Sequence, residues 1–163
     1  MILLEKAKEN FEIAEYAAQK GYFDTAISRL YYSSYQRIIY YKDNNITDGK
    51  IKFEEYKLQN QHNSNTEFYG SHDWNIAFFK DYNKDCGQYG YESIMGYLRD
   101  MKELRNIADY KTRRCCINID EYRKFENKGK LINNLIDILI NVVKGELWYD
   151  RYKIKKNERN IMQ

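Results

Sequence analysis

Three residues of one predicted helical segment, Arg105, Asn106 and Asp109, have the side chains best suited to hold an anion. Residues four apart lie on the same side of a helix, so we expect Asp109 beside Arg105. In one interpretation the two form a surface ion pair, which stabilises a helix by ~0.3–0.5 kcal/mol. In the other, Arg105 presents its planar guanidinium group to a phosphate that Asn106 helps to orient. The turn that follows adds three nearby cations, Lys111, Arg113 and Arg114.

Motifs of the common enzyme classes are missing from the sequence. There is no glycine-rich phosphate loop, no G-x-S-x-G and no H-E-x-x-H. Neither His62 nor His72 follows a glutamate by three positions, which argues against a di-iron site, and we expect no metal and no cofactor. Ser71-His72-Asp73 has the composition of a catalytic triad, but adjacent side chains cannot point at one another as a triad requires. We interpret Ser71 as a helix cap.

Composition indicates one globular domain that can form long helices. The 163 residues include no proline and 17 tyrosines, and proline is the strongest helix breaker. Residues 144–163 hold six basic and three acidic side chains, so they carry the whole net charge of +3. The three cysteines, Cys86, Cys115 and Cys116, form no C-x-x-C pair, which favours a reducing cytoplasm. No signal peptide follows Met1, and no apolar run approaches the ~20 residues of a membrane span.

Helical spacing of apolar residues organises the first half of the chain. A first helix has Leu4, Ala7, Phe11, Ala14 and Ala18 on one face and ends before Gly21. A second helix over 25–42 would begin at an Asp24 cap and bury Ile27, Tyr31, Ser34, Ile38 and Tyr41. The short connection between them predicts an antiparallel hairpin. Residues 43–70 are polar and rich in turn formers, which predicts a long loop insertion.

The second half of the chain predicts three more helices. A short one follows Ser71 and has Trp74, Phe78 and Tyr82 on one face, and one over 91–110 buries Ile94, Tyr97, Met101, Leu104 and Ala108. The last begins at an Asp120 cap and includes Gly129 in its apolar stripe, which indicates close helix packing. We therefore predict an all-α, up-and-down bundle of four main helices plus a short helix over residues 1–143. Residues 144–163 are a basic tail or an extension of the last helix.

Three segments together resemble a known family. They are GYFDTAISRLYYSSY over residues 21–35, Ser71-His72, and RNIADY over residues 105–110. In order and spread they are similar to HEPN domains, most closely to a little-characterised prokaryotic branch. The resemblance covers most of residues 1–143, and the 43–70 loop is longer than the connection usual in that family. It implies a helical bundle that forms a homodimer and brings two copies of the Arg105 segment to one cleft.

The resemblance also implies a chemistry. Active HEPN ribonucleases cut RNA without metal, using an arginine, often followed by a polar residue, and a histidine one to two helical turns later. Arg105 and Asn106 match this pattern, whereas Asp109 and Tyr110 occupy the positions where the family pattern has its histidine. Tyrosine has a pKa near 10, and a carboxylate held by an arginine is a weak base. His72 could instead reach the site from the neighbouring helix.

Two functions follow as hypotheses. The first is a cytoplasmic endoribonuclease of a defence or toxin–antitoxin system, which uses Arg105 and Asn106 with Tyr110 or Asp109 and binds RNA through Lys111, Arg113 and Arg114. The second is an inactive module that holds RNA, a nucleotide or a protein partner. A nucleotidyltransferase or a defence complex is a possible partner, and Tyr110 is then a conceivable acceptor of an adenylyl group. Tyr31, Tyr32 and Tyr35 fit packing better than base stacking.

Overall fold

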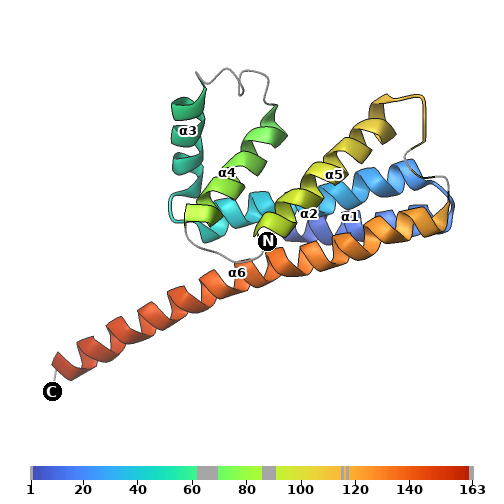
Figure 1. The fold of residues 1–163 in the computed structure, drawn as a ribbon. Helices are drawn as coiled ribbons and strands as arrows, with labels where there is room; N and C mark the ends of the chain where they lie inside the picture. Colours follow the sequence, from blue (N-terminus) through green and yellow to red (C-terminus); the bar gives the residue numbers. More distant parts are fainter. Residues whose placement is uncertain (1, 62–69, 86–90, 115, 117, 162–163) are drawn as a thin grey trace.

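The described part of the chain is helical in this computed structural model, which confirms the all-α bundle (Figure 1). The structure describes residues 2–61, 70–85, 91–114, 116 and 118–161, and it describes no side chains for residues 85, 91 and 142–161. Within these ranges there is no strand, and six helices replace the predicted four plus one. They are α1 (Ile2–Gln19), α2 (Phe23–Asn45), α3 (Gly49–Asn60), α4 (Ser71–Asp85), α5 (Tyr91–Tyr110) and α6 (Ile119–Ile161).

The hairpin of α1 and α2 forms as predicted, but its second helix starts earlier. Gly21 has a φ of +80°, a left-handed conformation that ends α1 and reverses the chain within three residues. Because the turn is so short, α2 begins at Phe23, and the predicted cap at Asp24 is wrong. Tyr22 occupies the cap position and makes no side-chain cap hydrogen bond. Asp24 lies in the first helical turn, where its charge complements the helix dipole.

Helix α2 is the central element of the bundle, since it packs against each of the other five helices. All five residues predicted for its apolar face are buried, namely Ile27, Tyr31, Ser34, Ile38 and Tyr41. The exposed fractions of Tyr31 and Ser34 are both 0%, so polar groups of this helix lie inside the core. These buried polar groups need partners, and the neighbouring helices provide them.

The predicted loop over 43–70 is wrong for most of its described part. Helix α2 continues to Asn45, and α3 occupies Gly49–Asn60. Phe53 is buried in α3 and its ring lies 5.6 Å from that of Phe78, while the Tyr56 hydroxyl donates a hydrogen bond of 2.6 Å to Asp81 of α4. These contacts order a polar helix whose own sequence gives little amphipathic signal. Residues 62–69 of the predicted loop lie outside the described residues.

Helix α6 begins one residue before the predicted cap. Asn118, not Asp120, caps it, because the Asn118 Oδ1 accepts hydrogen bonds of 3.0 Å from the backbone NH groups of Asp120 and Glu121. The helix then runs for 43 residues, so residues 144–161 are its extension and not a separate tail. Figure 1 shows that this end of α6 projects beyond the other helices. No helix of the described ranges is both long and apolar enough to cross a membrane.

Gly129 lets α6 approach α2 and α5 closely, as its place in the apolar stripe predicts. A Cβ atom at this position would lie 2.5 Å from the Tyr97 hydroxyl oxygen and 3.0 Å from Cδ1 of Leu30. Both side chains are fully buried, so neither can move aside without disturbing the core. The close packing that a missing side chain allows therefore offsets the poor helix propensity of glycine.

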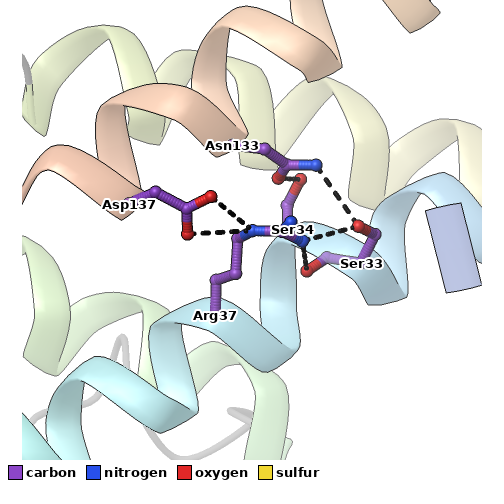
Figure 2. A network of polar contacts seen from close by, with 5 residues as sticks. All are labelled: Ser33, Ser34, Arg37, Asn133 and Asp137. Carbon is purple, nitrogen blue, oxygen red and sulfur yellow. Dashed lines mark hydrogen bonds and ion pairs between the residues drawn. The ribbon is translucent and has the colours of Figure 1, made fainter. Parts of the chain in front are cut away.

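A polar network also joins α2 to α6 (Figure 2). The Ser34 hydroxyl donates a 2.6 Å hydrogen bond to Asn133 Oδ1, and the Asn133 amide donates one of 3.2 Å to Ser33 Oγ. Arg37 donates to Ser33 Oγ at 2.8 Å and pairs with Asp137 at 3.2 Å. Ser33, Ser34 and Asn133 are buried, and the Asp137 side chain is 43% exposed. The network thus reaches from the core to the surface.

Candidate functional site

Arg105 forms the expected ion pair with Asp109 near the end of α5. The Nε atom of Arg105 lies 2.6 Å from Oδ2 of Asp109, and the two side chains are 15% and 26% exposed. Ser28 of α2 donates a long hydrogen bond of 3.5 Å to the same carboxylate oxygen. The pair is therefore half-buried between two helices, which is a more enclosed setting than the free helix surface that the spacing alone suggests.

Two tyrosines and an asparagine complete the surroundings of Arg105. Its Nη2 donates a 2.8 Å hydrogen bond to the Tyr32 hydroxyl and one of 3.3 Å to the Tyr110 hydroxyl. Its Nη1 lies 3.5 Å from Oδ1 of Asn106, and its guanidinium carbon lies 5.4 Å and 5.2 Å from the ring centres of Tyr32 and Tyr110. We call Arg105, Asn106, Asp109, Tyr110 and Tyr32 the Arg105 cluster.

The Arg105 cluster holds its central residue in the charged form. Burial alone would lower the pKa of Arg105, but Tyr32, Asp109 and Tyr110 outweigh that effect and raise it. The guanidinium group is therefore a fixed cation in a planar geometry set by neighbours on two helices. A fixed planar cation with partial exposure is the arrangement that recognises a phosphate group.

Tyr32 is a member of the site that the sequence assigned to packing and not to the Arg105 segment. Ser28, Tyr32 and Tyr35 follow spacings of four and three, so they form a second face of α2 beside the buried one. This face contacts Asp109 through Ser28 and Arg105 through Tyr32. The predicted packing role is confirmed for Tyr31 and Tyr35, which are buried, whereas Tyr32 is half-buried and bonded to Arg105.

His72 lies next to the Arg105 cluster, since its ring contacts the ring of Tyr32. Its ring centre is 4.0 Å from that of Tyr35 and 5.8 Å from those of Tyr31 and Tyr32. The Tyr32 side chain thus touches His72 with its ring and Arg105 with its hydroxyl group. The structure brings together two residues that are 33 positions apart in the sequence, from α4 and α5.

The imidazole of His72 is held uncharged and oriented. Burial lowers its pKa, and the positive charges of Arg105 and Lys102 lower it further, while Asp73 opposes them. Its Nδ1 lies 3.1 Å from the Tyr31 hydroxyl oxygen, and its Nε2 has no hydrogen-bond partner among the described residues. In the tautomer in which Nδ1 donates to Tyr31, Nε2 is free to accept a proton.

The neighbours of His72 in the sequence have other roles, so Ser71-His72-Asp73 is no triad. Asp73 forms an ion pair with Lys102 of α5, and its other carboxylate oxygen accepts a 3.2 Å hydrogen bond from the backbone NH of Gly70. Ser71, predicted as the cap of this helix, is its first residue instead, and Asp73 makes the bond back to the preceding turn.

The three basic residues after α5 lie apart from these contacts. Lys111, Arg113 and Arg114 are exposed. Arg114 lines a separate cavity of about 200 Å³ together with residues 21–25 at the start of α2. The structure therefore gathers Arg105, Asn106, Asp109 and Tyr110 at one site and places the three cations in the turn that leaves it.

Comparisons with family models, curated proteins and solved structures found no match to this chain. Within the described ranges, no group of three or more His, Cys, Asp or Glu side chains is placed to hold a metal ion.

Proposed function

We propose that this protein binds RNA at the Arg105 cluster and cleaves it without a metal ion. The observation that carries the proposal is that a fixed guanidinium group and an uncharged imidazole both contact Tyr32. A cation for the phosphate and a base for a hydroxyl proton are the two groups that RNA transesterification needs. The resemblance of residues 21–35 and 105–110 to HEPN domains supports the same chemistry.

In the proposed reaction the ribose 2′-hydroxyl attacks the neighbouring phosphorus atom. His72 Nε2 takes the proton of this hydroxyl, and Arg105 stabilises the negative charge that builds up on the phosphate oxygens. The bond to the 5′ oxygen then breaks, and this oxygen takes a proton from water or from Tyr110, whose side chain is 70% exposed. The products are a 2′,3′-cyclic phosphate and a 5′-hydroxyl end.

Incubating the purified protein with labelled RNA in EDTA tests this function. We expect fragments that end in a 2′,3′-cyclic phosphate, because both acting groups belong to the protein. A DNA of the same sequence is the control, since it lacks the attacking hydroxyl and should stay intact. RNA that remains whole in EDTA would show that the protein is not a metal-independent ribonuclease.

The pH dependence of cleavage should report the pKa of His72. A base acts only when unprotonated, and the pKa of His72 is lowered by burial, Arg105 and Lys102. The single-turnover rate should therefore rise with pH below about 6.5 and be level at neutral pH. A rate that keeps rising about tenfold per pH unit above neutrality would mean that hydroxide or another group is the base.

A second function has its own support in the contacts of Arg105. Every guanidinium nitrogen already has an acceptor nearby, in Asp109, Tyr32, Tyr110 or Asn106. This arrangement also suits a module that binds RNA, a nucleotide or a protein without turning it over. In that case Arg105→Ala would lower stability or RNA affinity, and the wild-type protein would release no product.

The HEPN resemblance further supports a cytoplasmic homodimer in a defence or toxin–antitoxin system. Leu131 and Ile138 are seven residues apart on α6 and are 58% and 55% exposed, so they present an apolar surface that a second copy would cover. A nucleotidyltransferase gene beside this one would favour a toxin–antitoxin pair, and a defence locus would favour an accessory subunit.

A further inference from the structure

A groove runs between α4 and α5 and encloses a cavity of about 710 Å³. Such a volume is typical of small-molecule sites. The residues of its two walls recur at helical spacing, so each wall is one face of a helix. On α4 they are Asp73, Ile76, Ala77, Lys80 and Lys84, and on α5 they are Glu92, Met95, Gly96, Arg99, Lys102, Glu103 and Asn106.

The groove has an apolar floor and charged rims. Ile76, Ala77, Met95 and Gly96 are half-buried and form the floor. Lys102 and Asp73 are paired with each other across one end of the groove. The exposed charged side chains of the rims are Lys80, Lys84 and Arg99 against Glu92 and Glu103, so cations outnumber anions.

Gly96 lies in the floor of the groove and in the interior of a long helix, where glycine is unusual. A Cβ atom at this position would find nothing within 4 Å, so no described residue requires glycine there. Glycine weakens a helix interior relative to alanine, and at Gly129 the close approach of Tyr97 explains it. At Gly96 no described side chain comes that close. A close approach would explain this glycine only if a bound molecule in the groove contacted the helix backbone there.

One end of the groove meets the Arg105 cluster. Asn106 lines the groove and lies 3.5 Å from Arg105 through its Oδ1 atom. Asp73, which also lines the groove, follows His72 directly in α4. A chain whose phosphate sits at Arg105 can therefore continue into the groove.

We infer that the groove between α4 and α5 binds the part of a single-stranded RNA that flanks the phosphate held at Arg105. This inference rests on the proposed function. A base of this strand lies on Ile76, Met95 and Gly96, where a flat ring can approach the helix backbone. The phosphates of the strand face Arg99 and Lys80 on the rims, where the excess of positive charge complements them. Only an unpaired strand can turn its bases toward such a floor.

Binding of a labelled oligonucleotide in which every ribose is 2′-O-methylated tests the groove, because such a strand cannot be cleaved. Gly96→Leu fills the floor and should weaken binding about 10-fold or more, without lowering Tm. Arg99→Glu should weaken it and reduce its salt dependence. Lys50→Glu is the matched control, since Lys50 is an exposed lysine of α3, and it should change Kd less than about twofold.

The results separate the groove from the reaction. If both groove variants bind as the wild type does, or if the wild type does not bind, the groove is not an RNA site. If the wild type cleaves RNA in EDTA while Gly96→Leu binds normally, the groove inference fails and the proposed function stands. If binding depends on Gly96 and Arg99 but no RNA is cleaved, the groove inference stands and the ribonuclease function fails.

Discussion

Replacing Arg105 by alanine is expected to lower the rate of RNA cleavage about 10²–10³-fold, the usual loss when one preorganised donor to a transition-state charge is removed. The Arg105 side chain is held in place by Asp109, Tyr32 and Tyr110, so no free energy is spent on reorienting it during the reaction. Arg105→Lys keeps a charge but loses the planar fork, and we expect it to recover only part of the rate. Single-turnover cleavage in EDTA measures both variants.

Two controls separate catalysis from folding in this experiment. Arg123→Ala removes an arginine whose side chain is 63% exposed on α6, and it should cleave RNA like the wild type. The Tm of Arg105→Ala shows whether the loss of its contacts also unfolds the protein. If Arg105→Ala is folded and cleaves RNA at the wild-type rate, Arg105 has no part in the reaction.

Asn133→Leu is expected to lower the free energy of unfolding by about 2–3 kcal/mol. The substitution keeps a similar side-chain volume but leaves the Ser34 hydroxyl without its acceptor, and Ser34 is 0% exposed. A buried polar group without a partner costs about 1–3 kcal/mol. Ser33 also loses one of its two donors, since only Arg37 remains. Urea denaturation measures the change.

Asp137→Asn is the matched control for this network. Asp137 forms an ion pair with the Nε atom of Arg37, but the Asp137 side chain is 43% exposed. Water can therefore replace the ion pair when the charge is removed. We expect a change below about 1 kcal/mol. Equal losses for the two variants, or no loss for Asn133→Leu, would mean that the network does not stabilise the contact between α2 and α6.

Much of the fold could be predicted from the spacing of apolar residues. The buried faces of α1, α2, α4 and α5 follow spacings of three and four, and Gly21 and Gly129 mark a turn and a close contact. Caps are harder to predict, because Asp24 and Asp120 have the right chemistry but Tyr22 and Asn118 occupy the cap positions. Local preference names the candidates for a cap, and chain geometry selects among them.

Helix α3 could not be predicted in the same way. Its sequence is polar, and its only buried large side chain is Phe53. The helix is stabilised by partners distant in the sequence, since Phe53 meets Phe78 and Tyr56 bonds to Asp81. A pattern within one segment holds no information about such contacts.

In the candidate site, too, local spacing predicts some contacts and contacts between distant segments determine the others. The Arg105–Asp109 pair follows from helical spacing, and the structure contains it. Tyr32 and His72 join it through packing between α2, α4 and α5, which a sequence without known pairings does not reveal. The sequence did not predict the groove, because only the packing of α4 against α5 forms a cavity between their facing sides.

Arg105 and His72 act on one phosphate in the proposed reaction, and a double-mutant cycle of cleavage rates in EDTA tests this most directly. His72→Phe keeps the aromatic packing on Tyr35 and removes the base, so we expect a loss of about 10²-fold or more. The double variant Arg105→Ala, His72→Phe should be about as slow as the slower single variant, because groups that act as a unit are not additive. Losses that simply multiply, or a His72→Phe protein as fast as the wild type, would contradict a shared site.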